Sequence, residues 1–259
     1  MNLEFLRPFV NAKVCDGMFN YEKLTHYIEK RRTAPYRRIA LVGAGGKTSA
    51  MYALGHYFKG QGKKVVLTTT TKVFTPDSKD VDAVCFTTSF PECLLDLGRR
   101  ENQVIFIGKS FDKNNKVTGF EPEEVPVHCL KDPDVFIYEA DGAKRRSIKA
   151  PREDEPRILA ETDLVIGVVG LDVLGKPACE NFVHRLEKFQ EITHIKENKR
   201  IESQHVGMLV RHPMGLFKDV PNTADKILLL TKMDTEARSF WALAIQEELE
   251  DWEGHVISI

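Results

Sequence analysis

Cysteine is scarce in this sequence, and long apolar runs are missing. The five cysteines form no C-x-x-C pair, and an odd number of scattered thiols is typical of a reducing compartment rather than of a disulfide framework. No apolar run approaches the ~20 residues that a membrane-spanning helix needs, and the first residues lack the basic-then-apolar layout of a signal peptide. We therefore expect a cytoplasmic protein that is neither exported nor embedded in a membrane.

An excess of charge of either sign is also absent. Lys and Arg number 37 and Asp and Glu number 38, so that the formal net charge is -1. A chain with so little net charge exerts no long-range attraction on nucleic acids or anionic lipids, and we expect neither as a partner. Internal repeats and low-complexity tracts are lacking too. The 42% of hydrophobic and 29% of charged residues are typical of a globular protein of enzyme size.

Short apolar runs alternate with amphipathic stretches along the chain. Continuous runs rich in β-branched residues are expected for strands that are covered on both faces. They occupy residues 39–42, 65–67, 83–86, 104–107, 135–138, 164–169 and 227–230. Apolar side chains at helical spacing occur in residues 50–58 and 237–252. This alternation predicts an α/β fold of the P-loop NTPase-like kind, with a doubly wound, mostly parallel sheet and helix and loop insertions.

We expect a single nucleotide-binding domain over residues 1–259, because one parallel α/β sheet commonly uses a chain of this length. Residues 1–34 are predicted to be a helical lead-in, with residues 21–32 its most helix-like part. Residues 181–221 contain several histidines and little strand character, which predicts a helix and loop insertion. Insertions of this kind usually carry the substrate side of a site.

The sharpest local motif is a glycine-rich loop between the first core run and the first amphipathic stretch. It consists of Gly43, Ala44, Gly45, Gly46, Lys47, Thr48 and Ser49. Glycines permit the positive φ angles that turn backbone N–H groups inward, and the helix N-terminus adds its positive end. The loop is therefore predicted to bind the phosphates of a nucleotide. Lys47 would bridge the β- and γ-phosphates, and the Thr48 hydroxyl would ligate Mg²⁺.

The spacing within this loop is that of the shorter G-x-x-G-K-T variant, of the kind found in Mur-type amide ligases. The full G-x-x-x-x-G-K-[ST] pattern requires a glycine at the position that Leu41 occupies here. A tight turn between strand and helix with an exposed lysine is the alternative interpretation.

Two acids follow the apolar run at residues 135–138. Glu139 and Asp141 are two residues apart, so that both side chains point to the same side of a strand. They stand at its carboxyl end, where ligands bind in open α/β sheets. With Lys47 they are the predicted catalytic group. One acid would hold Mg²⁺ together with Thr48, directly or through water, and the other would orient a nucleophilic water or hydroxyl. A pair of solvated strand-end acids is the alternative.

Other polar side chains are expected near the loop as candidates for binding a second substrate. Thr70 and Lys72 follow the run at residues 65–67, although threonine is also simply a good strand former. Lys144 and Lys149 belong to a basic segment directly after the two acids. Cations beside a triphosphate would stabilise transition-state charge, and a solvated basic turn is the alternative.

A T-K-x-D sequence follows the last core run. Thr231, Lys232 and Asp234 match a form of the N-K-x-D motif that reads guanine. Asp234 would accept hydrogen bonds from the N1–H and the amine of guanine, while the Lys232 stem would lie over the base. Threonine replaces the amide that asparagine would present. The expected cofactors are therefore Mg²⁺ and either ATP or GTP.

Longer strings in this sequence resemble those of the YqeC family. They comprise residues 43–48, 68–72, 139–144, 149–151, 155–156, 168–177 and 183–185. The resemblance extends from about residue 39 to residue 234. It implies a P-loop nucleotide-binding protein that assists the maturation of selenium-dependent molybdenum hydroxylases. The implied partners are a molybdenum hydroxylase or its cofactor-maturation proteins.

The resemblance also implies a second-substrate side of the site. Its candidate residues are Asp172, Lys176, His184 and Arg185. A shaped loop is the alternative for residues 170–177, and a surface His-Arg pair is the alternative for His184. The family tends to follow its His-Arg pair with proline and glutamate, where this chain has Leu186 and Glu187. This departure bears on the role of the His-Arg pair, and Thr231 in place of a frequent asparagine bears on guanine specificity.

Three functions are compatible with these motifs. The leading one is a Mg²⁺-dependent nucleoside triphosphatase whose hydrolysis drives a maturation step. The second is a small-molecule kinase or Mur-like amide ligase, and the third is a nucleotide-gated chaperone with little turnover. Cysteine and histidine lack metal-ligand spacing, so no zinc site is expected.

Overall fold

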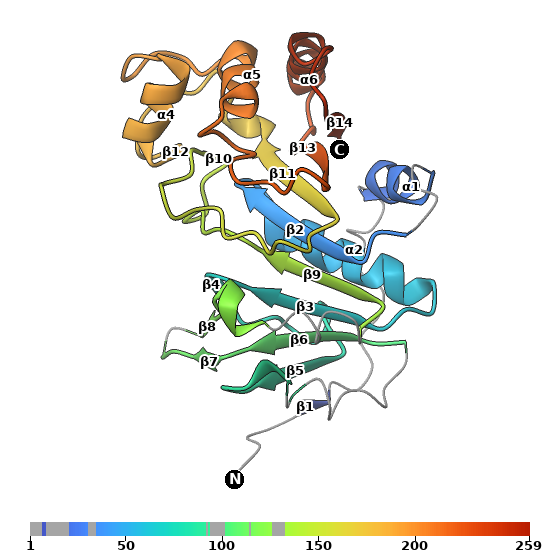
Figure 1. Ribbon diagram of the computed structural model, residues 1–259. Coiled ribbons are helices and arrows are strands. Elements are labelled where there is room, and N and C mark those ends of the chain that lie inside the picture. The colour runs from blue at the N-terminus through green and yellow to red at the C-terminus, as the bar shows by residue number, and fades with distance from the viewer. Residues whose placement is uncertain are drawn as a thin grey trace. The chain divides into compact units, whose positions relative to one another are not determined.

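The computed structural model describes residues 7–8, 21–30, 35–91, 93, 102–113, 115–125 and 133–259 (Figure 1). The chain divides into two compact units. The first comprises Met1–Ala40, Thr48–Ala140 and Leu159–Asp163, and the second comprises Leu41–Lys47, Asp141–Ile158 and Leu164–Ile259. A single domain over the whole chain stays a prediction.

The first unit contains a mostly parallel sheet. In spatial order its strands are β1 (Arg7–Pro8), β5 (Ala83–Phe86), β6 (Val104–Gly108), β3 (Val65–Thr69) and β9 (Val135–Glu139). All of these pair in parallel except β1, which is antiparallel to β5. The carboxyl ends of the parallel strands therefore share one edge, where Thr69 of β3 pairs with Glu139 of β9.

Helices and a small sheet complete the described part of the first unit. The helices are α1 (Glu22–Lys30) and α2 (Lys47–Gly60), whose first residue belongs to the second unit. A Cβ built on Gly55 of α2 would lie 3.1 Å from Val104 Cγ1, so this helix packs closely on β6. The small antiparallel sheet has the order β4 (Lys72–Phe74), β8 (Lys116–Thr118) and β7 (Ser110–Phe111), and it precedes a 3₁₀ turn, η2 (Pro122–Glu124).

Strand β2 (Arg38–Gly43) belongs to both units. In the first unit, Phe136 N at β9 donates a hydrogen bond to the carbonyl of Arg37, 2.6 Å away. In the second unit, Ala44 N, directly after β2, donates to Val168 O at 2.8 Å. All residues of β2 after Arg38 are buried, as expected for a strand in the middle of a sheet.

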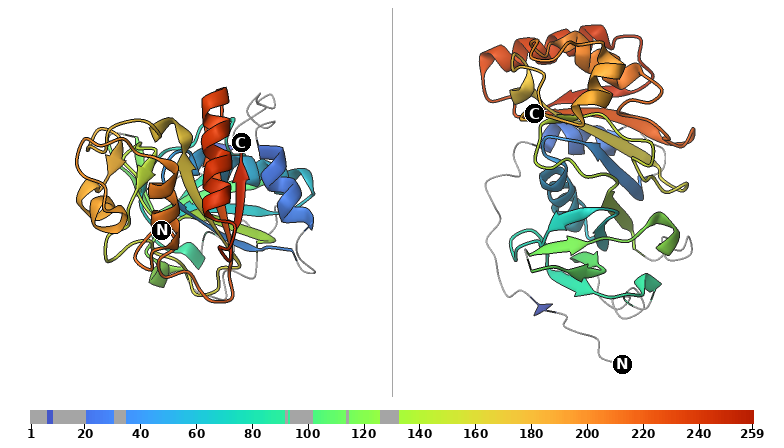
Figure 2. Two further views of the ribbon diagram at one scale, coloured as in Figure 1. Left: turned by 90° about the horizontal axis from the view of Figure 1, so that it is seen from above. Right: turned by 90° about the vertical axis from the view of Figure 1, so that its left-hand side faces the viewer.

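The second unit contains parallel strands and most of the described helices. β11 (Leu164–Gly170), β13 (Asp225–Thr231) and β14 (His255–Ser258) pair in parallel in that order. A 3₁₀ turn, η4 (Leu171–Val173), follows β11. Helix α4 (Leu186–Thr193) packs on α5 (Ser203–Arg211), and α5 packs on α6 (Glu236–Glu248), as the orange and red helices of Figure 2 show. β10 (Ile148–Lys149) and β12 (Val183–His184) form a short parallel pair.

The apolar runs form the predicted strands. Every residue of β3, β6, β9 and β11 is buried, which is why these strands read as continuous apolar runs in the sequence. The predicted amphipathic stretch at residues 50–58 lies inside α2. The α/β class with a mostly parallel sheet is therefore confirmed.

Three expectations change at the level of elements. In the lead-in, α1 confirms the helix expected at residues 21–32, but Arg7 and Pro8 form a strand, and residues 1–6, 9–20 and 31–34 lie outside the described residues. The insertion at residues 181–221 is helix and loop as predicted, except for β12. The helical stripe predicted at residues 237–252 ends at Glu248, because the chain turns there before β14.

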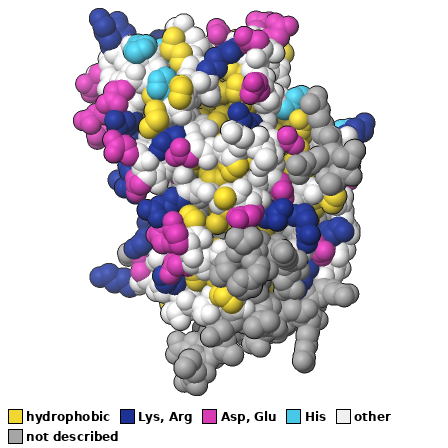
Figure 3. Space-filling view, viewed as in Figure 1, with side chains coloured by type: hydrophobic (Ala, Val, Ile, Leu, Met, Phe, Trp, Pro, Cys, Tyr) yellow, Lys and Arg dark blue, Asp and Glu magenta, His cyan; other side chains and the backbone are white. Residues whose placement is uncertain are grey.

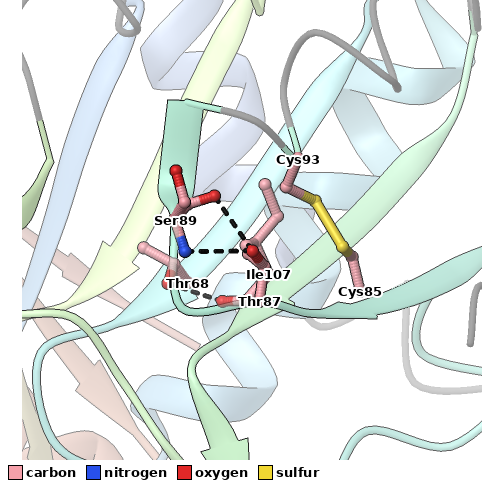
Figure 4. Close-up of a disulfide and its surroundings, with 6 residues drawn as sticks. All are labelled: Thr68, Cys85, Thr87, Ser89, Cys93 and Ile107. Atoms are coloured by element: carbon pink, nitrogen blue, oxygen red, sulfur yellow. Dashed lines mark hydrogen bonds between the residues drawn. A yellow bond between two sulfur atoms is a disulfide. The ribbon is translucent and has the colours of Figure 1, made fainter. Parts of the chain in front are cut away.

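Cys85 and Cys93 are joined by a disulfide, with their Cα atoms 7.1 Å apart (Figure 4). The expectation that the scattered cysteines are not disulfide-bonded is therefore wrong for these two residues, whereas Cys179 is free. The pairing arises because the chain turns after β5. Ser89 N donates to Thr87 Oγ1 at 3.0 Å within this turn.

None of the described helices combines the length and apolar character that crossing a bilayer requires.

Candidate functional site

The glycines of the predicted phosphate loop are required by its backbone. Gly43, Gly45 and Gly46 have φ angles of 89°, 99° and 135°, a region that disfavours residues with a Cβ. A Cβ on Gly43 would lie 2.5 Å from Val168 O, and one on Gly45 would lie 2.4 Å from Gly170 N. The loop therefore lies against β11 so closely that only glycine fits at these two positions.

Two backbone N–H groups of the loop donate hydrogen bonds within the protein, and two others have no acceptor among the described residues. Gly43 N donates to Asp141 Oδ2 at 3.0 Å, and Ala44 N donates to Val168 O. The N–H groups of Gly45 and Gly46 have no hydrogen-bond partner among the described residues. Consecutive N–H donors of this kind next to a helix N-terminus form an anion-binding backbone.

Lys47 is buried and held in a defined position. Its Nζ lies 2.9 Å from Asp141 Oδ1 and donates to the carbonyl of Gly43 at 2.6 Å, and only 5% of the side chain is exposed. The alternative of a turn with an exposed lysine is therefore wrong. The ammonium group lies directly at the glycine loop, where it can pair with a phosphate.

Asp141 pairs with more than one cation. Its Oδ2 lies 3.0 Å from Lys149 Nζ, in addition to the contact of Oδ1 with Lys47. Burial alone would raise the pKa of Asp141, but the charges of Lys47 and Lys149 outweigh burial and hold this pKa below its ordinary value. Asp141 is a buried, ionised acid, so the alternative of a solvated strand-end acid is wrong for it.

Glu139 contacts Thr48, the loop residue that follows Lys47. The Thr48 hydroxyl donates to Glu139 Oε1, and the Glu139 side chain is buried at the end of β9. Thr70 N donates to the Glu139 carbonyl at 2.9 Å and thereby holds the strand end. A hydroxyl beside a carboxylate fits Mg²⁺, which prefers oxygen ligands and takes few from the protein. The described residues contain no group of three or more His, Cys, Asp and Glu suited to a metal ion.

A chain of alternating charges continues from Asp141 into the rest of the second unit. Lys149 Nζ donates to Glu155 Oε2 at 2.7 Å and to Gly142 O at 2.8 Å. Arg185 Nη2 donates to Glu155 Oε1 at 2.9 Å. Lys149 is 1% exposed, so the alternative of a solvated basic turn is wrong for this residue, whereas the network reaches the surface at Arg185, which is 24% exposed.

His184 lies beside Lys149 in the pair of β10 and β12, where the two residues are directly opposite each other. Residues in such register project to the same side of a sheet. Burial, followed by the charges of Lys149, Arg185 and Lys144, lowers the pKa of His184 to about 4. His184 is therefore buried and neutral at neutral pH, so the alternative of a surface His-Arg pair is wrong for it.

The T-K-x-D residues take part in a separate set of contacts in the second unit. Thr231 Oγ1 donates to the carbonyl of Gly45 at 2.5 Å and so ties β13 to the glycine loop. Lys232 Nζ donates to Ser147 Oγ and to Asp172 Oδ2, each at 2.8 Å. Burial alone would raise the pKa of Asp172, but contacts that include the hydrogen bond from Lys232 outweigh burial and hold this pKa below its ordinary value. Asp234 is exposed and pairs with Arg238.

Several predicted residues are not part of these contacts. Ser49, Lys72 and Lys144 are exposed. Lys176 is exposed as well, and its Nζ lies 5.9 Å from the centre of the Phe182 ring, away from the charged network.

Sequence reasoning missed residues that stabilise the site from outside the motifs. Glu155 belonged to a family-like string but received no role. Lys218 was not considered, yet its buried Nζ donates to the carbonyls of Arg152 at 3.3 Å and Glu155 at 3.1 Å. A lysine that binds mainly backbone carbonyls distant in the chain leaves no signal in the sequence.

Figure 3 shows the distribution of charge on one face of the protein. On the face shown in Figure 3, basic and acidic side chains are interspersed. The buried alternation of charge from Lys47 to Arg185 is therefore a local property of the site.

Comparison with known proteins gives consistent results. Residues 39–187 match the model of a family described as "YqeC protein". The chain is also similar to a protein of Escherichia coli (strain K12) named "Uncharacterized protein YqeC", with 33% identity over 196 residues, which is 75% of each chain. The match to the family includes the glycine loop, both acids and the charged network up to Arg185, whereas Thr231 and Asp234 lie beyond it.

Proposed function

The chain belongs to the YqeC family, and we propose that it binds and hydrolyses a nucleoside triphosphate with Mg²⁺ at the loop of residues 43–49. One observation carries this proposal. A buried lysine, ion-paired at 2.9 Å with a buried aspartate, stands in a loop whose glycines all have positive φ angles. A tight turn alone requires neither the buried ion pair nor two N–H groups, those of Gly45 and Gly46, that have no partner in the described part of the chain.

Binding of the phosphates follows from the donors of the loop. The N–H groups of Gly45 and Gly46 would donate to phosphate oxygens, and the positive end of α2 favours negative charge there. Lys47 would contact the terminal phosphates, while Asp141 and the Gly43 carbonyl keep its ammonium group in place. Because these contacts exist before a ligand binds, little reorganisation is needed.

Thr48 and Glu139 are the residues that fit Mg²⁺. When bound, the ion would neutralise charge on the phosphate oxygens. Asp141 has a different role in the proposal, because both of its oxygens already face ammonium groups. It orients Lys47 toward the glycine loop.

The accessory role belongs to the same proposal and rests on the family resemblance. We propose that hydrolysis drives a step in the maturation of selenium-dependent molybdenum hydroxylases. Loss of the chain from its host should then lower the activity and the selenium content of such hydroxylases while their polypeptide levels stay constant. An unchanged selenium content would contradict this role.

The nucleotide function is tested with purified full-length protein, Mg²⁺ and ATP or GTP. Binding is measured by calorimetry and turnover by phosphate release, in the wild type, in Lys47→Met and in Lys59→Met. Lys59 is the matched control because it stands on the same helix and pairs with Asp82 in contact with solvent. We expect Lys47→Met to lower the affinity at least tenfold, since a charge-assisted bond contributes about 1.5–3 kcal/mol.

The outcomes of this assay separate the three functions. Phosphate release by the wild type supports a triphosphatase. Binding with negligible release supports a nucleotide-gated chaperone, and release only after addition of an acceptor supports a kinase or ligase. Wild-type protein that binds neither nucleotide would refute all of them.

A further inference from the structure

The buried charged network of the second unit has more cations than anions. Lys47, Lys149 and Arg185 alternate with Asp141 and Glu155, at distances of 2.7–3.0 Å between successive partners. Three cations against two anions leave an excess of one positive charge. Lys218 leaves this excess of positive charge unchanged. Its ammonium group pairs with the exposed Asp219, and its other partners are backbone carbonyls.

Such an excess is costly inside a protein unless an anion approaches it. Arg152 also lies near Glu155, with 3.6 Å between its Nε and Glu155 Oε1, but the same Nε pairs with Asp154 at 2.5 Å, so Arg152 and Asp154 together add no net charge. Lys144, which also influences His184, is another cation. The charges around the network therefore favour a negatively charged ligand.

Two side chains at the Arg185 end of this network have unused hydrogen-bonding atoms. Arg185 Nε is buried and has no hydrogen-bond partner among the described residues. The His184 side chain is 9% exposed, and the described part of the chain supplies no hydrogen bond to its ring. Both residues stand where β12 leads into α4, and His184 lies opposite Lys149.

We propose that His184 and Arg185 form a binding site for the oxyanion group of a second substrate, a phosphate or a carboxylate, and that Glu155, Lys149 and Asp141 connect this site to Lys47. The planar guanidinium of Arg185 suits such a group, because its Nε and Nη atoms donate in parallel to two oxygens. A neutral imidazole at His184 donates one further hydrogen bond and adds no charge to the cationic site. The ligand would supply the negative charge that the network lacks.

The role of this site for a second substrate rests on the proposed nucleotide function. Binding of the anion does not, and it is measured in the absence of nucleotide. The two parts of the proposal can therefore fail independently.

The test follows the imidazole signals of His184 by ¹H–¹⁵N NMR in the full chain, with His184→Gln to assign them. The probes are inorganic phosphate and succinate, titrated at constant ionic strength with chloride as the reference ion. We expect one of the probes to shift the His184 signals saturably. Lys47→Met, which removes the cation of the glycine loop, should weaken the shift less than the Arg185 variants do. Lys188→Gln, which changes an exposed lysine of α4, should leave the shift unchanged.

Arg185→Gln should weaken the binding of the effective probe about tenfold or more, as expected for the loss of a charge-assisted hydrogen bond. Arg185→Lys keeps the charge but lacks Nε, and it should also bind more weakly than the wild type. This second variant keeps the test decisive if Arg185→Gln does not fold. Circular dichroism checks the folding of each variant.

Two results would overturn the proposal. In the first, neither probe moves the His184 signals of the wild type. In the second, the shift disappears in Lys47→Met but survives in both Arg185 variants, which would place the ion at the glycine loop alone. If the anion binds as expected but nucleotide does not, the oxyanion site stands and its role for a second substrate is refuted.

Discussion

Replacing Lys149 by methionine should destabilise the protein strongly, although this residue lies outside the glycine loop. Lys149 Nζ contacts Asp141 Oδ2 at 3.0 Å, Glu155 Oε2 at 2.7 Å and Gly142 O at 2.8 Å, and the side chain is 1% exposed. Methionine fills a similar volume without the charge. The substitution therefore leaves Glu155 and Asp141 buried with fewer partners, and Gly142 O without this donor.

The size of the effect follows from the cost of an uncompensated buried charge. Removing one partner of a buried ion pair costs about 3–5 kcal/mol, much more than the loss of an exposed pair. Arg185 still contacts Glu155 and Lys47 still contacts Asp141, so we expect the lower half of this range. For a chain of this length, about 3–4 kcal/mol corresponds to a decrease in Tm of about 6–16 °C.

The measurement is urea and thermal unfolding of Lys149→Met, with Lys188→Met as the matched control. Lys188 pairs with Glu191 at 2.8 Å, but both side chains are largely exposed, so the control should leave the stability almost unchanged. Adding Glu155→Gln to Lys149→Met should cost less than the sum of the single changes, because the two residues interact directly. Equal stability of Lys149→Met and Lys188→Met would refute the buried network as a source of stability.

Other perturbations test separate parts of the structure. Gly45→Ala would place a Cβ 2.4 Å from a backbone atom at a φ angle of 99°. It should therefore lower the stability measured by thermal unfolding by at least about 1–3 kcal/mol and abolish nucleotide binding. Gly142→Ala, whose new Cβ would have no atom within 4 Å, should do neither. The pKa of His184 falls from 6.5 to about 4 on folding, so the unfolded chain binds the proton more tightly than the folded chain does. The stability measured by urea unfolding should therefore decrease as the pH falls from about 6.5 to 4. His184→Gln should lose this contribution to the pH dependence of stability. Asp234→Ala should weaken GTP binding much more than ATP binding in calorimetry, and equal losses would contradict guanine recognition at this position.

Much of the fold could be predicted because the central strands are buried on both faces. Such strands must be continuously apolar, and residues 164–169 or 135–138 need no tertiary information to be recognised. The strands that were missed, such as β10 and β12, are two residues long. They contain too few residues to show any periodicity, and only pairing with each other identifies them.

The glycine loop could be predicted for a related reason. Positive φ angles at Gly43, Gly45 and Gly46 are a local requirement that few other residues meet, so the need for them is visible in the sequence itself. That one of the acids Glu139 and Asp141 would act together with Thr48 also followed from local rules, because side-chain alternation and the strand end place both at the carboxyl edge. The structure decides that this acid is Glu139.

The amino-acid sequence by itself determined the α/β class, the glycine loop with Lys47, and the acids Glu139 and Asp141, since each depends on neighbouring residues or on a simple period. Only the tertiary structure decided that Asp141 faces both Lys47 and Lys149, that Glu155 joins Lys149 to Arg185, and that Cys85 bonds to Cys93. The physical reason is that an ion pair or a disulfide depends on where two side chains meet in space. A sequence shows which residues carry charge or sulfur, and folding determines which of them become partners.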